Sequence, residues 1–276
     1  MILGGMNHYK AVAFDLDDTL LRDDLSISGL TLEVFRKLHK NGLIFVAASG
    51  RTLMSMKPFT DRIGCVSLCI ACNGAIIWNP ADGKVLHRET FSVELCREIA
   101  RFGNEFGCYA QTYSDDRFYF NEVSDYSRNY ATSSMLPGEC VGNLEEYICE
   151  PRSKILMMAE PEKISKMLGL ARTRFAGCAS VTCSKPYFLE FNPLNATKGI
   201  ALTKAAEVLT LTPDSFIAFG DSLNDLPMLQ TAGYSVAVSN SRPDVRSVCN
   251  AVCMSNQDDG VARFLADIFL SKEAKA

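Results

Sequence analysis

Two carboxylates, Asp15 and Asp17, stand two residues apart directly after an apolar run over residues 11–14. A strand that ends in acids at i and i+2 places both of them on one side of the chain as it leaves the sheet. Like charges held this close resist joint ionisation, so the pair calls for a bound cation or a shared proton. One acid can then attack an electrophile while the other transfers protons. Taken alone, residues 15–19 are also compatible with a solvated acidic turn at a sheet edge.

Two further segments carry groups suited to phosphate oxygens. Ser49-Gly50-Arg51 follows a second apolar run and offers a hydroxyl, an unencumbered amide and a cation. Lys198 opens a predicted helix, where a cation is unfavourable for the helix dipole, so a specific role is indicated. In isolation the tripeptide also fits an ordinary strand-to-helix cap, and the lysine a solvated surface residue.

The fourth segment, residues 220–225, again follows an apolar strand pattern. Gly220 lets the backbone turn tightly, and Asp221 and Asp225 at i and i+4 can share one face of a helix. An acidic helix cap explains Asp221 alone but leaves Asn224 and Asp225 unexplained. The segment is therefore a candidate to contribute further carboxylates to the same site.

The beginning of the chain alternates between strand and helix patterns. Strands are predicted over residues 10–14, 43–48 and 66–71, and helices over 28–40 and 52–63. Strands separated by helices of this length pair in parallel through right-handed crossovers. Such sheets bind ligands beyond the carboxyl ends of their strands, which is where Asp15 and Ser49 fall.

The pattern changes after residue 74 and returns near residue 198. Residues 75–78 and 84–87 flank a turn and predict a hairpin, and residues 91–191 read as an aromatic, antiparallel sheet with packed helices. The helices are predicted over residues 93–106, 122–131 and 162–175. The strands are predicted over 108–113, 117–120, 154–159, 179–183 and 187–191. Beyond residue 198 we predict helices over 198–209, 223–231 and 258–270 and strands over 215–219 and 235–238.

The simplest account is one discontinuous α/β domain with an inserted α+β domain. We place the parallel-sheet domain at residues 1–83 and 189–276 and the insertion at 84–188.

The composition excludes several classes of function. With 276 residues, 47% apolar, 22% charged and a net charge of −4, the chain has no basic footprint for nucleic acid. It contains no apolar run long enough to cross a bilayer, and residues 1–5 lack the features of a signal peptide, so we expect a cytoplasmic protein without membrane partners. Eleven cysteines, an odd number in mainly apolar settings, are expected to be free buried thiols.

Taken together, the four segments resemble the haloacid dehalogenase superfamily, most closely its Cof-like class IIB sugar-phosphatase branch. Residues 15–20 resemble that family's first motif, 49–51 its second, 198–199 its third and 220–225 its fourth. Residues 73–75 and 256–262 also look like recurrent family segments. The resemblance implies a Rossmann-like parallel-sheet core with an inserted α+β cap that acts as a lid and selects the substrate.

The resemblance also implies roles for the acids. Asp15 would attack phosphorus to form an aspartyl phosphate, and Asp17 would act as general acid and then as general base. Mg²⁺ would be held by the carboxylate of Asp15, the backbone carbonyl of Asp17 and the carboxylate of Asp221. Asp225 would assist, through the surrounding hydrogen bonds or a metal-bound water.

The remaining motif residues would handle the phosphoryl group and the rest of the substrate. By resemblance, the phosphoryl group would be bound by Leu16, Ser49, Gly50, Lys198 and Asn224. Arg51 and Asn73 would contact the substrate or hold the loops. In the cap, Tyr109, Tyr113, Phe118 and Tyr119 could stack on a sugar, although such aromatics more often form the core of a sheet.

The implied activity is Mg²⁺-dependent hydrolysis of small phosphorylated metabolites, with sugar phosphates as the expected substrates. A phosphomutase acting on hexose phosphates is an alternative, because related capped enzymes return the phosphoryl group to sugar. A phospho-accepting signalling module is a second alternative, although Asp17 and the lid both favour turnover. The sequence identifies neither the physiological substrate nor the oligomeric state.

Overall fold

The sheet that carries the predicted site has eight strands in the order β14-β13-β12-β1-β2-β3-β4-β5. The computed structural model describes residues 8–114 and 116–271, so the predicted lead-in over residues 1–5 lies outside the described residues. Six strands run parallel: β1 (Ala11–Phe14), β2 (Ile44–Ala48), β3 (Val66–Ala71), β12 (Phe216–Gly220), β13 (Tyr234–Val238) and β14 (Ala251–Cys253). The antiparallel edge is the predicted hairpin, β4 (Ile76–Trp78) and β5 (Val85–Arg88).

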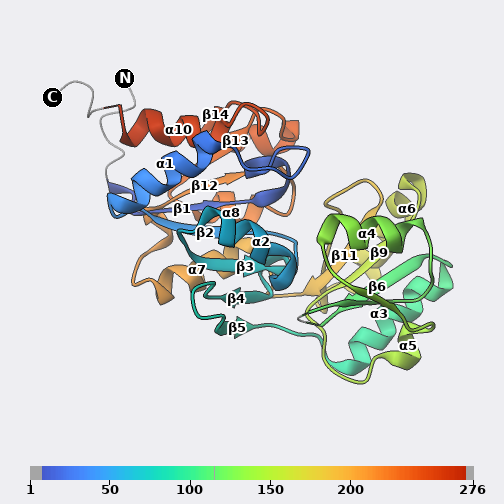
Figure 1. The fold of residues 1–276 in the computed structure, drawn as a ribbon. Coiled ribbons are helices and arrows are strands. Elements are labelled where there is room, and N and C mark those ends of the chain that lie inside the picture. Colours follow the sequence, from blue (N-terminus) through green and yellow to red (C-terminus); the bar gives the residue numbers. More distant parts are fainter. Residues whose placement is uncertain (1–7, 115, 272–276) are drawn as a thin grey trace.

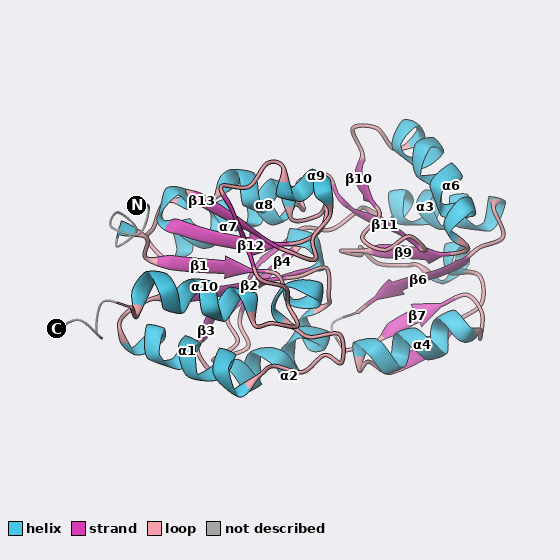
Figure 2. Ribbon diagram, turned by 90° about the horizontal axis from the view of Figure 1, so that it is seen from above, coloured by secondary structure: helices cyan, strands magenta, loops and turns pink. Residues whose placement is uncertain are grey.

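Helices cover both faces of this sheet, as a parallel sheet requires. Alternate residues of β1 point to opposite sides: Val12 and Phe14 join one apolar cluster, and Ala11 and Ala13 the other. The first cluster contains residues of α1 (Gly29–Lys40), α2 (Leu53–Ile63) and α10 (Gly260–Phe269), and the second contains residues of α7 (Lys198–Val208), α8 (Leu226–Thr231) and α9 (Pro243–Arg246). Figure 2 shows the strands running between these layers.

The starts of the helices follow from hydroxyl caps. Ser28 accepts a hydrogen bond from the backbone amide of Thr31, and Thr52 accepts one from that of Ser55. These caps satisfy amides that the first helical turn leaves without a partner. Each helix therefore begins close to its predicted position.

A second lobe carries a six-stranded sheet in the order β10-β11-β9-β6-β7-β8 (Figure 1). Its strands are β6 (Tyr109–Tyr113), β7 (Phe118–Phe120), β8 (Gly138–Cys140), β9 (Ile155–Met158), β10 (Ala179–Thr182) and β11 (Phe188–Pro193). One face packs on α3 (Val93–Glu105), α5 (Leu144–Tyr147) and α6 (Pro161–Arg174), and the other on α4 (Asp125–Ser134). The predicted α+β character of the insertion agrees with this architecture.

The pairing of β7 with β8 is parallel, so the second sheet is not wholly antiparallel as predicted. Neither β8 nor α5 was predicted, and the same holds for α9 and β14 in the first lobe. All four elements are only three or four residues long. Elements of this length contain too few residues to establish a hydrophobic period. Short turns of helix also occur at Leu16–Leu20, Cys72–Gly74 and Pro213–Ser215.

Strand pairing moves both predicted domain boundaries. β5 pairs with β4, so the first sheet continues to Arg88 rather than to residue 83. β11 pairs with β9 and β10, so the second sheet continues to Pro193 rather than to residue 188. Composition changes at the aromatic strands, but hydrogen bonding between strands decides which sheet each edge belongs to.

The structure can be compared with two expectations from the composition, which concern the cysteines and membrane-spanning helices. All eleven cysteines are free, but Cys140, Cys149 and Cys178 are exposed, so the thiols are not all buried as expected. Among residues 8–114 and 116–271, no helix combines the length and apolar character needed to cross a bilayer.

Candidate active site

The predicted segments meet at a cleft between the two lobes. From the first lobe the cleft is lined by residues that include Asp15, Asp17, Ser49, Gly50, Arg51, Asp221 and Asn224. These residues follow the carboxyl ends of β1, β2 and β12, which the parallel sheet places side by side. From the second lobe it is lined by residues that include Tyr130, Ser133, Ser134, Lys154, Lys185 and Glu190.

Lys198 joins two of the acids. Its Nζ lies 2.5 Å from Oδ1 of Asp15 and 2.6 Å from Oδ1 of Asp225, and the lysine side chain is 0% exposed. Burial alone would lower the pKa of Lys198, but the two carboxylates more than offset it and hold the ammonium charged. The predicted cation is thus set directly against the predicted nucleophile.

The carboxylate of Asp225 fixes the loop that follows β12. Its Oδ2 accepts hydrogen bonds of 3.0 Å from the backbone amides of both Asp221 and Ser222. The approach is close, because a Cβ on Gly220 would lie 2.6 Å from the Cβ of Asp225. Glycine is therefore required for this geometry, in which Asp225 positions Asp221 and Lys198 through hydrogen bonds.

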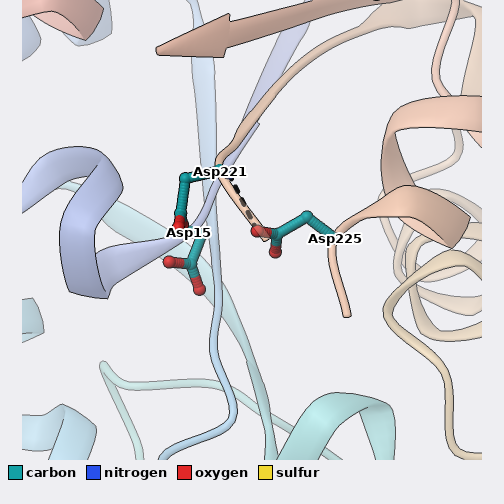
Figure 3. Close-up of side chains that lie close together, drawn as sticks. All are labelled: Asp15, Asp221 and Asp225. Carbon is teal, nitrogen blue, oxygen red and sulfur yellow. Dashed lines mark hydrogen bonds between the residues drawn. The ribbon is translucent and has the colours of Figure 1, made fainter. Parts of the chain in front are cut away.

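Three carboxylates form a group suited to a cation. Each of Asp15, Asp221 and Asp225 offers an oxygen, and these oxygens lie within 4.8 Å of one another (Figure 3). Thr19 donates a 2.9 Å hydrogen bond to Oδ1 of Asp221. The donor set consists of oxygen alone, which fits Mg²⁺. Because Asp225 already accepts from Lys198 and two amides, Asp15 and Asp221 are the better placed carboxylates for direct ligation.

The pKa values of Asp15 and Asp221 also favour a bound cation at this group of carboxylates. Burial, together with the neighbouring Asp225, Asp221 and Asp17, raises the pKa of Asp15 above its usual range, against the lowering effect of Lys198. Burial and the charge of Asp225 raise the pKa of Asp221 to about 7. A divalent cation would relieve this crowding of negative charge and favour the ionised forms.

The carboxylate of Asp17 is not part of the group formed by Asp15, Asp221 and Asp225. Arg51 binds it in a bidentate pair, with Nε 2.8 Å from Oδ2 and Nη2 2.7 Å from Oδ1. Burial would raise the pKa of Asp17, but the hydrogen bonds and charge of Arg51 outweigh burial and lower it. Nη1 of Arg51 also donates to the backbone carbonyl of Ser133 in α4, at 3.0 Å. Arg51 thus links Asp17, the residue predicted to act first as general acid and then as general base, to the second lobe.

Asn73 holds loops together and does not line the cleft. Its Oδ1 accepts from Nδ2 of Asn224 at 3.0 Å, and its Nδ2 donates to Oδ1 of Asn192 at 3.1 Å. Nδ2 of Asn192 in turn donates to the carbonyl of Cys72 at 3.0 Å. Of the two roles expected for Asn73, the geometry favours the structural one.

The remaining predicted residues differ in which of their groups can reach the cleft. The side chain of Leu16 is fully buried in the core of the first lobe, so only its main chain is available to a phosphoryl group. The hydroxyl of Ser49 accepts from the backbone amide of Arg51 at 3.1 Å, which shapes the turn around Gly50. The aromatic residues Tyr109, Tyr113 and Phe118 are buried in the cap core, as the more common role of such residues suggested.

Sequence reasoning missed the residues that the second lobe contributes. Lys154 and Glu190 line the cleft although they are 4% and 3% exposed. The available signal was a charged residue within an apolar strand, since Glu190 stands between Leu189 and Phe191. A buried charge in such a strand needs a partner or a function.

Comparison with known proteins decides the family. A family model described as haloacid dehalogenase-like hydrolase matches residues 12–265. The chain belongs to this family. Within it, the chain is 28% identical to the 5-amino-6-(5-phospho-D-ribitylamino)uracil phosphatase YcsE of Bacillus subtilis, over 92% of this chain and 93% of that protein.

Solved structures share the whole architecture. TM0651 from Thermotoga maritima is 31% identical with a TM-score of 0.81, covering 94% of this chain and 97% of that one. The class IIB sugar phosphatase BT4131 has the same fold, with a TM-score of 0.82 at 19% identity and coverage of 94% and 98%. The predicted Rossmann-like core with an inserted cap is confirmed, and the chain is a haloacid dehalogenase-like hydrolase.

Proposed function

We propose that this enzyme is a Mg²⁺-dependent phosphatase that hydrolyses small phosphorylated metabolites, sugar phosphates in particular, through an aspartyl phosphate on Asp15. The observation that carries the proposal is the buried contact between Asp15 and Lys198 beside a group of three carboxylates at the cleft. Phosphoryl transfer requires a nucleophile, a positive charge held beside it and a site for a metal ion. Asp15, the ammonium of Lys198 and the three carboxylates would supply these in turn.

The first chemical step would be carried by Asp15 and Asp17. A carboxylate oxygen of Asp15 would form a bond to phosphorus while the bond from phosphorus to the leaving oxygen breaks. Asp17 would donate its proton to that oxygen, which requires Asp17 to be protonated in the substrate complex. Lys198, the Gly50 amide, the Ser49 hydroxyl and Asn224 would neutralise and orient the phosphoryl oxygens.

The second step would release phosphate. Asp17, now ionised, would remove a proton from water as the water oxygen attacks phosphorus, and the carboxylate of Asp15 would be restored. Bound Mg²⁺ would supply further neutralisation of the phosphoryl charge, held by Asp15, Asp221 and the Asp17 carbonyl. Asp225 would keep Asp221 and Lys198 in place.

The test is phosphate release from a panel of phosphorylated sugars, nucleotides and cofactors, with Mg²⁺ and with EDTA. We expect Mg²⁺-dependent release that Asp15→Asn reduces by at least about a thousandfold, since the covalent step is lost. Asp61→Asn, on the exposed surface of α2, is the matched control and should keep full activity. Absence of release from every compound, or full activity in Asp15→Asn, would contradict the proposal.

The cellular location is a further part of the proposal. A cytoplasmic enzyme is supported by eleven free cysteines, which a reducing compartment preserves. A small phosphorylated metabolite as partner, rather than nucleic acid, is supported by the net charge of −4 and by a cleft shared between two lobes.

A further inference from the structure

The face of the cap sheet that meets the cleft carries a buried ion pair. Glu190 of β11 stands opposite Leu156 of β9 in the antiparallel register, and Lys154 lies two residues before Leu156, so the three share one face. All three line the cleft. This face is therefore one part of the second lobe that a substrate in the cleft would meet.

Only one oxygen of the Glu190 carboxylate is satisfied. Nζ of Lys154 makes a short hydrogen bond to Oε1 of Glu190 and a 2.8 Å hydrogen bond to the carbonyl of Gly50. Oε2 of Glu190 is buried and has no hydrogen-bond partner among the described residues. An unpaired buried carboxylate oxygen is destabilising, so its retention at a cleft indicates a partner that arrives from outside.

The same contacts place Glu190 near the reaction centre. Lys154 bridges Glu190 to Gly50, in the loop that we propose binds the phosphoryl group. A group that reaches Oε2 would therefore belong to the part of the substrate attached to the transferred phosphoryl group. The neighbouring lining residues Tyr130, Ser133 and Ser134 are also polar, which suits a hydroxylated ligand more than an apolar one.

We propose that Oε2 of Glu190 accepts a hydrogen bond from a hydroxyl of the leaving group, and so selects phosphate esters of sugars and polyols. The inference rests on the proposed function and assigns a specificity residue to it. An ionised carboxylate only accepts hydrogen bonds and repels a second phosphate, whereas a hydroxyl donates one. A site built to bind a hydroxyl discriminates strongly against substrates that lack it, because its own polar group is then left unpaired.

The experiment compares two substrates in wild type and Glu190→Gln. One is a hexose 6-phosphate, and the other is phenyl phosphate, whose leaving group carries no further hydroxyl. Lys154 only donates hydrogen bonds, so the new amide would turn its oxygen to Lys154 and present its NH₂ group where Oε2 was. We expect kcat/KM for the sugar phosphate to fall about tenfold or more, and that for phenyl phosphate to change less than about twofold.

Deoxy analogues of the sugar phosphate provide a second readout, and its wild-type measurement does not depend on any variant. Removing the hydroxyl that Glu190 binds should lower kcat/KM in wild type by a similar factor, and the same removal should have little further effect in Glu190→Gln. Glu146→Gln, on the exposed surface of α5, is the matched control and should behave as wild type. Melting temperatures of both variants would report any loss of folding.

Each outcome separates this inference from the proposed function. Equal losses on both substrates with Glu190→Gln, or wild-type indifference to every single deoxygenation, would overturn the role of Glu190 while leaving the phosphatase intact. Hydrolysis of phenyl phosphate without hydrolysis of any hydroxylated ester would do the same. Failure of wild type on all esters would overturn the proposed function, and this inference with it.

Discussion

At the scale of single residues, the unexpected contact is the pair between Asp17 and Arg51. A general acid must hold a proton, yet Arg51 lowers the pKa of Asp17 and favours the ionised form. The pair therefore suits the second step of the proposed mechanism, in which Asp17 would act as base. In the first step, contact with a leaving group would have to displace Arg51 or raise the pKa of Asp17.

Replacing Arg51 should change the pH dependence of that second step. In Arg51→Gln, burial of Asp17 is opposed only by the charges of Lys185 and Lys198, so the pKa of Asp17 should rise. In the proposed mechanism, phosphoenzyme breakdown needs ionised Asp17, so its rate should fall as pH drops through that pKa. We expect the acid limb of the breakdown rate, measured by rapid quench, to move to higher pH by about one unit or more.

The control is Arg62→Gln, in α2, the helix that follows Arg51, and outside the cleft. This variant should keep the wild-type acid limb. An acid limb at the same pH in Arg51→Gln as in wild type would mean that Arg51 does not tune Asp17.

At the scale of elements, the packing of α7 against α8 places Lys198. A Cβ on Gly199 would lie 2.4 Å from the carbonyl oxygen of Pro227 and 2.9 Å from Oγ1 of Thr231. Glycine at this position lets the two helices pack closely. The close packing brings Nζ of Lys198 within hydrogen-bonding distance of Asp15 and Asp225. The sequence pair Lys198-Gly199 thus combines a functional side chain with the close contact that positions it.

Two glycine substitutions should have opposite effects on stability. Gly199→Ala forces α7 away from α8 and should lower the free energy of unfolding by about 1–3 kcal/mol. Gly169→Ala, in α6 with no atom within 4 Å of the new Cβ, should raise it by about 0.5–1 kcal/mol through helix propensity. Denaturant titrations would measure both changes. A stabilised Gly199→Ala variant would show that the packing of α7 does not depend on glycine here.

At the scale of the whole molecule, the cleft belongs to both lobes. Arg51 reaches the carbonyl of Ser133, Lys154 reaches that of Gly50, and Ser153 donates to the carbonyl of Glu89 at 2.9 Å. A substrate must therefore enter between two lobes that are already hydrogen-bonded to each other. We propose that the second lobe acts as a lid that excludes water and restricts the size of the leaving group.

The enclosure predicts a strong preference for small esters. A phosphoserine in a folded protein would have to hold the lobes apart, breaking these contacts. We expect kcat/KM for a folded phosphoprotein to be at least about a hundredfold below that for a hexose phosphate. Comparable values for the two, measured by phosphate release under one set of conditions, would mean that the second lobe does not limit access.

Residue types and spacing were sufficient to predict which side chains gather at the strand ends. Asp15 and Ser49 each follow an apolar strand, and parallel strands separated by helices must bring their carboxyl ends to one edge of a sheet. Those features are local or follow from chain direction, so spacing and residue type were sufficient. The tertiary structure alone decided the partners of charged groups. Arg51 meets Asp17 across 34 positions of sequence, Lys154 meets Glu190 across 36, and β8 lies parallel to β7. No local pattern encodes such pairings, because they depend on which strands become neighbours within each sheet and on which buried charges then lie within reach of one another.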